Sequence, residues 1–430
     1  MSDTPNLGFV RHEPIPPSPP PVQQAGAVKW VRENLFSNWI NSILTILSIY
    51  FVVKIILAST PWMWNGVWTT SSLRECREVL QGTSGACWSV LTERWNQMLF
   101  GFQYPVEAYW RPTLAFVLLL VCIAPVLFQK LPRKMLIFSA IYPFLAFWLI
   151  WGGTLLTPVI VGLSLIAGYM AFVKTERLIG FATGLLSSVV AVALVLYLGS
   201  FVTAALSGFI ALEPVASRDM GGFMLNLILG TVCVSLSIPL GIVLALGRQS
   251  NMPIIKGICV VFIEFIRGVP LITLLFVANV VLSYFFPPGT NLDLILRVII
   301  MITLFSAAYI AEVIRGGLAA LPRGQYEAAD SLGLDYPQAM RLIILPQALK
   351  ISIPGIVNVA VGLFKDTTLV SVISMFDLVG MIRGPISSST AWTGIYWELY
   401  LFAILLFFVV CYGISQYSQW LERQLRTDHH

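Results

Sequence analysis

The sequence predicts an all-α integral membrane protein with about ten transmembrane helices. Of its 430 residues, 57% are apolar and 11% are charged, and the mean hydropathy is +0.82. A soluble domain carries roughly 45–50% apolar and about 25% charged residues, so this chain has too little charge to cover a surface in water. Its apolar runs are long and continuous, which favours helices over the alternating strands of a membrane β-barrel.

The predicted spans fall into two groups of five, separated near residue 210. Each run is long enough to cross the hydrocarbon core, which takes about 20 helical residues. The spans cover about residues 39–59, 113–129, 135–151, 155–173, 179–207, 222–247, 255–286, 292–314, 346–365 and 394–418.

Two polar segments lie outside the spans of the first half. Residues 1–37 begin with a run of prolines and predict a disordered cytoplasmic tail, either a plain tether or a partner-binding segment. Residues 60–112 form a tryptophan-rich excursion between the first two spans. The segment 38–210 is therefore expected to hold membrane helices with one long polar excursion.

The placement of lysine and arginine predicts the orientation of the chain. Most of the 26 basic residues fall on the side that holds the N-terminus, whereas the 21 acidic residues split almost evenly. The positive-inside rule therefore predicts that both ends of the chain are cytoplasmic. The excursion is then external, where Cys76 and Cys87 either form a disulfide or remain free thiols.

Composition also excludes several kinds of function. The three histidines are His12, His429 and His430, so no interior histidine serves as a base or metal ligand. No GxxxxGK[ST] run occurs, so this chain holds no ATP in a Walker A loop. The net charge of +5 is small and reflects membrane topology rather than nucleic-acid binding. We therefore expect no enzyme activity, no bound cofactor or metal, and a lipid bilayer as the environment.

The two halves differ in where their ionisable residues lie. Spans before residue 210 contain almost no charge, whereas those after it are broken by glycine, proline and ionisable side chains. Polar groups at membrane depth are costly and usually mark a pathway or a contact surface. The segment 211–425 is therefore predicted to carry the function.

The longest polar stretch of the second half is residues 322–346, which the topology places on the inner side. Good helix formers predict a first short helix that Gly333 ends. Asp335 and Pro337 suit the start of a second helix. We expect Pro346 to end that helix and to start the next span. A compact pair of helices on a membrane face predicts a docking element.

This stretch resembles the EAA loop of the membrane subunits of ATP-binding-cassette (ABC) importers, in which EAA is followed after fixed spacings by G, I and LP. The matching residues, at full spacing, are Glu327, Ala328, Ala329, Gly333, Ile343, Leu345 and Pro346, with Gly324 and Gln325 before the glutamate as in amino-acid permeases. The resemblance implies that this loop inserts into a groove on a separate ATPase subunit. An amphipathic inner loop without a partner is the alternative.

Further segments are similar to signatures of the polar amino-acid permeases. They are Glu264–Leu271 (FRGTPLL, with Val for Thr), Ala308–Gly316 (AYxAExxRG), Leu345–Pro354 (LPQALRxxLP, with Lys for Arg) and Phe364–Leu369 (LKDTSL). The resemblance covers about residues 220–425 and implies a type I ABC importer permease core within 211–425. The long N-terminal extension resembles the larger permease subunit of the general L-amino-acid importers of Gram-negative bacteria.

The family resemblance implies a function and a set of partners. We expect a permease subunit of the bacterial inner membrane that moves L-amino acids from periplasm to cytoplasm by alternating access. It would pair with a second, homologous permease, dock on an ATPase dimer that binds ATP and magnesium, and receive substrate from a periplasmic binding protein. An ATP-independent channel or secondary transporter for small polar solutes is the alternative function.

Polar residues on the later spans are the candidates for a substrate pathway or an inner gate. Glu264 and Arg267 lie three apart and can pair on one helix face, just before Gly268 and Pro270 break that helix. A pair that only holds the kink is the alternative. The other candidates are Asn226, Thr231, Ser306, Tyr309, Glu312, Lys365, Asp366 and Thr367.

Three of these candidate groups have specific expectations. Glu312 lies three residues before Arg315, so the two can pair near the base of the inner loop. Lys365, Asp366 and Thr367 offer both charges for a zwitterion, with a structural Lys–Asp pair as the alternative. The small polar residues have helix–helix hydrogen bonding as their alternative role.

Overall fold

The structure of the chain is a computed structural model, and most of its residues are described. The described residues are 26–128, 130–208, 210–281, 284–285 and 292–425. Residues 1–25, which hold the prolines of the predicted tail, lie outside them, as do residues 426–430.

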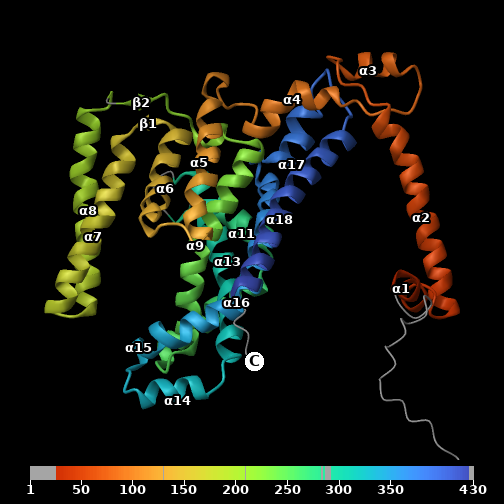
Figure 1. The fold of residues 1–430 in the computed structure, drawn as a ribbon. Helices are drawn as coiled ribbons and strands as arrows, with labels where there is room; N and C mark the ends of the chain where they lie inside the picture. The colour runs from red at the N-terminus through yellow and green to blue at the C-terminus, as the bar shows by residue number, and fades with distance from the viewer. Residues whose placement is uncertain (1–25, 129, 209, 282–283, 286–291, 426–430) are drawn as a thin grey trace, which may run out of the picture. The chain divides into compact units, whose positions relative to one another are not determined.

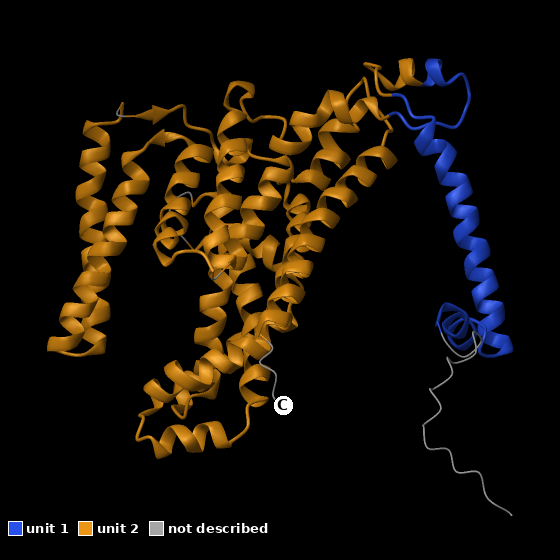
Figure 2. Cartoon of the chain, in the orientation of Figure 1, with its two compact units in different colours: residues 1–67, 77–87 blue, residues 68–76, 88–430 orange. Residues whose placement is uncertain are grey.

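The described chain divides into two compact units (Figure 2). One comprises residues up to 67 together with 77–87, and the other comprises 68–76 and the chain from 88 onward. The short helix α3 (Leu73–Leu80) has residues in both units.

The smaller unit holds α1 (Gly26–Asn34) and α2 (Trp39–Trp64). α1 lies where the sequence predicts a disordered tail, because this part of the segment lacks proline and Lys29 pairs with Glu33 at 3.8 Å one turn along. α2 is capped by Asn38, whose side chain accepts a hydrogen bond from Asn41 N at 2.8 Å. No residue of α2 is buried, as expected of a first span that faces lipid.

In the larger unit, the chain before residue 213 forms one shorter helix, α4, and four long apolar helices, α5 to α8, with short elements at their ends. The helices are α4 (Ser89–Phe100), α5 (Trp110–Leu127), α6 (Leu136–Trp151), α7 (Leu156–Leu178) and α8 (Phe181–Ala205), with single turns η2 (Val106–Ala108) and η3 (Arg133–Met135) and strands β1 (Gly153–Thr154) and β2 (Ala211–Leu212). The two strands pair antiparallel, with Gly153 opposite Leu212. α7 and α8 form a hairpin and lie side by side (Figure 1).

The chain after residue 213 alternates long helices with short, irregular segments. The long helices are α9 (Gly222–Gln249), α10 (Pro253–Gly268), α13 (Leu294–Ala319), α16 (Leu345–Asp366) and α18 (Trp397–Leu425). The short elements are η4 (Ser217–Asp219), α11 (Leu271–Phe276), η5 (Val277–Val281), α14 (Gly324–Ser331), α15 (Tyr336–Ala339), η6 (Met340–Ile344), η7 (Thr367–Ile373), α17 (Leu378–Met381) and η8 (Ile382–Ile386). Within this unit, α14 and α15 lie at one end and α4 and α17 at the other (Figure 1).

The predicted transmembrane helices are confirmed. Among the described residues, nine helices are long and apolar enough to span a membrane, and α10 with α11–η5 forms a tenth, bent span. The bend is 102° and falls between Gly268 and Leu271, at the glycine and proline that predicted a break.

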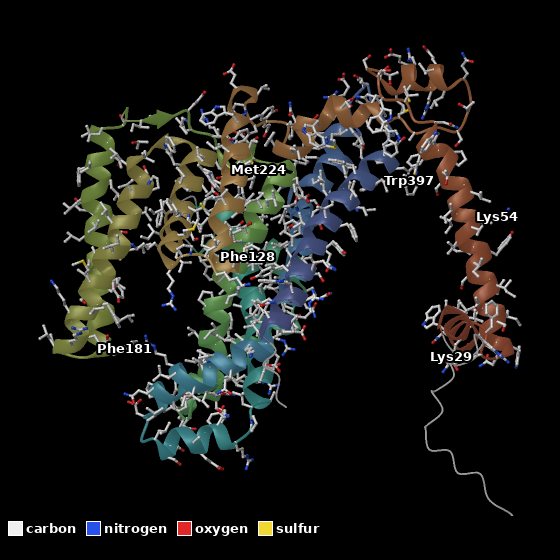
Figure 3. The ribbon with its side chains drawn as sticks, viewed as in Figure 1. Lys29, Lys54, Phe128, Phe181, Met224 and Trp397 are labelled. Atoms are coloured by element: carbon white, nitrogen blue, oxygen red, sulfur yellow. The ribbon has the colours of Figure 1, made fainter. Side chains whose placement is uncertain are left out.

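α9 and α13 form the centre of the larger unit. Met224 of α9 is 1% exposed among the central helices, whereas Trp397 at the start of α18 is 78% exposed (Figure 3). A Cβ atom at Gly241 of α9 would come within 2.6 Å of the Ile310 side chain on α13, so glycine is needed for this close approach.

The N-terminal helices share this centre only in part. One hydrophobic cluster joins Leu149 and Ile150 of α6 to Leu225 and Leu229 of α9, across the domain boundary predicted near residue 210. α7 and α8 instead pack mainly on each other. Within the extension, α6 is therefore packed on the core, whereas the α7–α8 hairpin packs mainly on itself and is largely exposed.

Candidate functional site

The predicted inner loop folds as two short helices with the expected ends. α14 ends at Gly333, whose φ of +68° lies in the left-handed region that favours glycine. Leu334 N then donates to Ala329 O at 3.3 Å. Asp335 caps α15 by accepting from Gln338 N at 2.9 Å, and the Gln338 side chain completes a capping box.

One face of this loop is exposed and mixes acidic with apolar side chains. Glu327 and Ala328 are exposed, whereas Ala329 is fully buried within the loop. Three large apolar side chains are also open, namely Leu332 at 72%, Tyr336 at 59% and Leu342 at 64% exposed. Burial raises the pKa of Tyr326 of α14, which packs against the hydrophobic cluster that contains Met340 and Ile344. The loop thus packs against the rest of the unit on one side and leaves its other face exposed.

Pro346 lies in the first turn of the next span, as the sequence predicts, but contrary to the prediction it does not end the second helix. The backbone widens into the π-helical turn η6 at Met340–Ile344 and continues without a break into α16, with Pro346 in its first turn. The wider turn accommodates a proline ring that lacks an N–H and would clash with the preceding turn of a regular α-helix. Gln347 then donates to Gln325 Oε1 at 2.9 Å, which ties α16 back to α14.

A network of five charged side chains lies near the C-terminal ends of the three helices α9, α10 and α13. Glu312 of α13 contacts Arg315 at 2.5 Å and Arg248 at 3.3 Å. Glu264 of α10 contacts Arg248 at 2.8 Å and Arg267 at 4.0 Å, and Arg267 also lies 3.8 Å from Glu312. The two predicted local pairs therefore both form, and they merge into one network.

Two further contacts fix the position of this network. The guanidinium group of Arg267 lies 5.5 Å from the centre of the Tyr309 ring. Directly beside the network, a hydrophobic cluster joins Ala245, Ile263 and Ile314 to Met340 and Ile344 of the inner loop. The network and the loop therefore rest on the same packed helix ends.

A cluster of buried polar groups, which we call the knot, lies near the N-terminus of α9, at the end opposite to Arg248. Asn226 is fully buried and donates to Thr367 Oγ1 at 2.9 Å and to Asp377 Oδ2 at 3.1 Å. Its own oxygen accepts from Leu378 N at 3.2 Å, and Asp377 caps α17 by accepting from Gly380 N at 2.9 Å. Burial raises the pKa of Asp377 to about 6, although these hydrogen bonds lower it.

The structure thus groups some of the predicted pathway residues and separates others. Glu264, Arg267, Tyr309 and Glu312 meet in the charge network, and Asn226 meets Thr367 in the knot. Thr231 is half-buried on α9, and the Ser306 hydroxyl is buried without a hydrogen-bond partner in the described part of the chain.

The predicted Lys365–Asp366 pair is not formed. Lys365 is exposed and Asp366 is half-buried, and within the described chain no ion pair of 4.0 Å or less joins them. Adjacent helical residues point about 100° apart, which keeps two neighbouring charges from meeting.

Two residues of these sites were not among the predicted ones. Arg248 is a lone arginine at the end of a span, and its partners come from other helices. Asp377 lies in a polar segment whose folding back onto α9 has no local signal.

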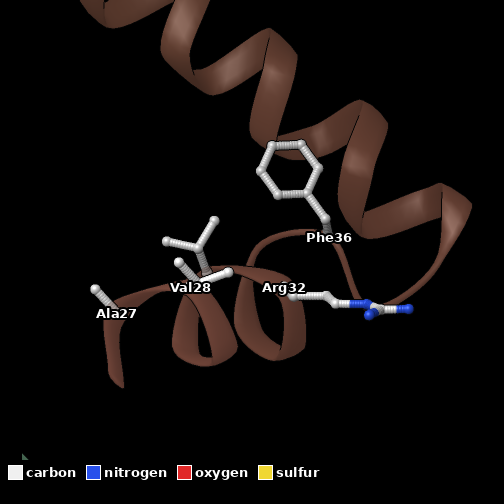
Figure 4. Close-up of a pocket in the computed structure, with 5 residues that line it drawn as sticks. Ala27, Val28, Arg32 and Phe36 are labelled. Carbon is white, nitrogen blue, oxygen red and sulfur yellow. The ribbon is translucent and has the colours of Figure 1, made fainter. Parts of the chain in front are cut away.

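Two surface hollows lie away from these sites. In the smaller unit, Ala27, Val28, Val31, Arg32 and Phe36 line a shallow hollow, and Arg32 extends away from Val28 (Figure 4). In the larger unit, an open apolar hollow lies between α4 and α5, lined by Trp95, Phe100, Tyr109 and Trp110 among others. Neither gathers polar groups that would hold a small polar ligand.

Cys76 and Cys87 are both buried, at 0% and 4% exposed. Their predicted pairing stays a prediction, whereas Cys122, Cys233, Cys259 and Cys411 are free.

Comparison with known proteins gives concordant likenesses. Residues 237–427 match the family described as binding-protein-dependent transport system inner membrane component. The chain is 52% identical, over the full length of both proteins, to the glutamate/glutamine/aspartate/asparagine transport system permease protein BztC of Rhodobacter capsulatus. It is 39% identical to the inner membrane amino-acid ABC transporter permease protein YhdY of Escherichia coli, over 96% of each chain. A crystal structure of an amino-acid ABC transporter with histidines is 33% identical over 47% of this chain and 92% of that chain, with a TM-score of 0.43.

Proposed function

The chain belongs to the amino-acid ABC transporter permeases, and from this premise we propose that it is the membrane subunit of an ATP-driven importer that moves L-amino acids into the cytoplasm. The full-length likeness to a permease named for glutamate, glutamine, aspartate and asparagine supports these four as the substrate class. The chain itself hydrolyses nothing in this proposal. Its task is to open and close a path through the inner membrane in step with a partner.

The exposed face of the inner loop, formed by α14, its C-terminal end and the start of α15, is the observation that carries the proposed coupling to an ATPase. Glu327 offers a charged anchor there, and exposed Leu332 and Tyr336 offer apolar surface. Open apolar side chains beside a charge are typical of a surface that another protein covers. We assign this face to the ATPase subunit, which binds ATP and magnesium, and the closing of that subunit would push the loop against the helix ends above it.

The remaining partners follow from the same premise. A second homologous permease would complete the path, and a periplasmic binding protein would deliver substrate to the end that holds α4 and α17. Both ends of the chain would then lie in the cytoplasm. Among the pathway candidates, the charge network is proposed to lie at the inner gate, next to the break at Gly268.

The direct test of coupling is to change the loop and measure two quantities. Glu327→Gln removes the anchor charge, and Gly333→Val places a β-branched residue at a left-handed φ, which turns the chain wrongly after α14. We expect both variants to lose co-purification of the ATPase and ATP-dependent uptake in proteoliposomes. Glu176→Gln, an exposed acid at the end of α7, is the matched control and should retain both.

Two outcomes would contradict the proposal. Wild-type uptake and ATPase co-purification in both loop variants would remove the loop from the coupling. Uptake that persists without any ATPase subunit would favour a channel or secondary transporter instead.

A further inference from the structure

Arg248 joins two helices that the chain order does not bring together. It lies in the last turn of α9, and its Nη1 atom alone contacts Glu264 of α10 at 2.8 Å and Glu312 of α13 at 3.3 Å. Arg267 contacts the same two glutamates, but at 4.0 and 3.8 Å. Arg248 therefore makes the two shortest contacts between helices in this network.

The place of these contacts matters because α10 ends at the break. Glu264 lies one turn before Gly268, after which the backbone turns by 102° into α11. In the described chain, the N–H of Val269 makes no backbone hydrogen bond that caps the C-terminal end of α10, and Pro270 has no N–H to donate. The direction of α10 is thus held by packing and by the charge network rather than by the backbone at the break.

The same helix ends carry the inner loop. Ala245 lies one turn before Arg248, and Ile263 lies next to Glu264, and both pack in the cluster that contains Met340 and Ile344. A shift of the loop therefore reaches α9, α10 and α13 together, provided that their ends stay joined.

We propose that Arg248 is a positioning residue that clamps α10 to α13 through their glutamates, so that movement of the inner loop turns the broken span as one block with α9. This inference rests on the proposed coupling to an ATPase. Without Arg248, Glu312 keeps its contact with Arg315 on its own helix, but the only ion pair left between α10 and α13 in the described chain is the 3.8 Å contact of Arg267 with Glu312. We expect that α10 would then no longer follow the loop. ATP would then be hydrolysed without a matching opening of the path.

The test uses the whole importer, reconstituted with its ATPase and binding protein in proteoliposomes. Arg248→Met removes the charge and keeps the length of the side chain, whereas Arg248→Lys keeps one nitrogen where Nη1 makes both contacts. We measure uptake of glutamate and hydrolysis of ATP in the same vesicles. Uptake per ATP should fall about fivefold or more in Arg248→Met and return toward wild type in Arg248→Lys.

Matched variants separate this clamp from general damage. Lys256→Met removes an exposed cation from α10 outside the network and should leave uptake per ATP unchanged. Glu264→Gln removes one of the two ion pairs of Arg248. Because the Glu264 side chain is 53% exposed, this change should not prevent folding, so it tests the clamp even where Arg248→Met fails to fold. It should lower uptake per ATP in the same direction, by less.

The outcomes also distinguish this inference from the proposed function. ATPase co-purification should persist in Arg248→Met, whereas it is lost in Glu327→Gln. Wild-type uptake per ATP in both Arg248→Met and Glu264→Gln overturns the clamp while leaving the coupling loop intact. A loss in Arg248→Met that Arg248→Lys does not reverse at all also overturns it, because the charge would then not be the cause.

Discussion

The helices before residue 210 and those after it are similarly apolar but differ in what joins them. α7 and α8 pack on each other through apolar and small side chains, whereas α9, α10 and α13 are also joined by a network of partly exposed charges. The buried amide of Asn226 further joins α9 to Thr367 and Asp377. In the described chain, the π-helical turns η5, η6 and η8 all fall in the second group. Irregular backbone and interhelical polar contacts thus occur together, in the part to which we assign the transport movement.

The extension meets the core at discrete polar contacts near its ends. Arg111 at the start of α5 donates to Glu213 O at 2.7 Å, just before the core begins. At the other end of α5, Tyr417 of α18 donates to Leu127 O at 2.6 Å, and its ring contacts Phe128. From these contacts we propose that the extension braces the core and does not line the path.

The largest expected effect concerns the knot of the core. Asn226→Leu leaves Asp377 buried without one partner and Leu378 N without an acceptor, so we expect a loss of roughly 3–4 kcal/mol in the free energy of unfolding. Ser164→Ala is the matched change in the extension, because that buried hydroxyl bonds only within α7. It should cost less than about 1 kcal/mol in the same denaturant titration in detergent. Equal losses would remove the difference between the two regions.

The second effect is a pH dependence that belongs to the core alone. The pKa of Asp377 is raised from 3.8 to about 6 by burial, so the folded state holds its proton more tightly than the unfolded state. Its contribution to stability is therefore complete below about pH 4 and is lost as the pH rises through about 6, a change of roughly 3 kcal/mol.

The neutral variant Asp377→Asn keeps an oxygen acceptor for the α17 cap and does not titrate. Its melting temperature should fall less than that of the wild type between pH 5 and pH 7.5. An identical fall in both proteins would show that Asp377 does not titrate in this range.

The third effect sharpens the description of the extension as a brace. Arg111→Met removes a charge-assisted hydrogen bond from a side chain that is 8% exposed, at an expected cost of about 2 kcal/mol in unfolding free energy. Because no pathway candidate is touched, uptake per ATP should stay at the wild-type value in proteoliposomes. A change in that ratio would place the extension in the transport cycle.

The smallest effect is expected at the other end of α5. Tyr417→Phe keeps the ring contact with Phe128 and removes only the bond to Leu127 O, which should cost about 1 kcal/mol. Thermal unfolding of this variant beside Arg111→Met ranks the two attachments. A larger loss for Tyr417→Phe would reverse the ranking.

Much of the fold could be predicted from local sequence features, whereas the sites depend on contacts between distant segments that such features do not reveal. Apolar runs predicted the spans, Gly268 and Pro270 predicted the break, and Gly333 predicted the end of α14, because each acts through the chain next to it. Pro346 misled the prediction because a π-helical turn accommodates it. Only part of the charge network was predicted. Sequence spacing identifies pairs on the same helix, but it does not show that an arginine from another helix joins them.

The most direct test of the account is to ask what touches the inner loop. A photoreactive amino acid at exposed position 328 of α14 is compared with one at position 178, an exposed leucine at the end of the α7–α8 hairpin. Illumination of the intact importer should link position 328, but not position 178, to the ATPase subunit. Equal linking from both positions, or none from position 328, would contradict the proposal that the inner loop docks on the ATPase.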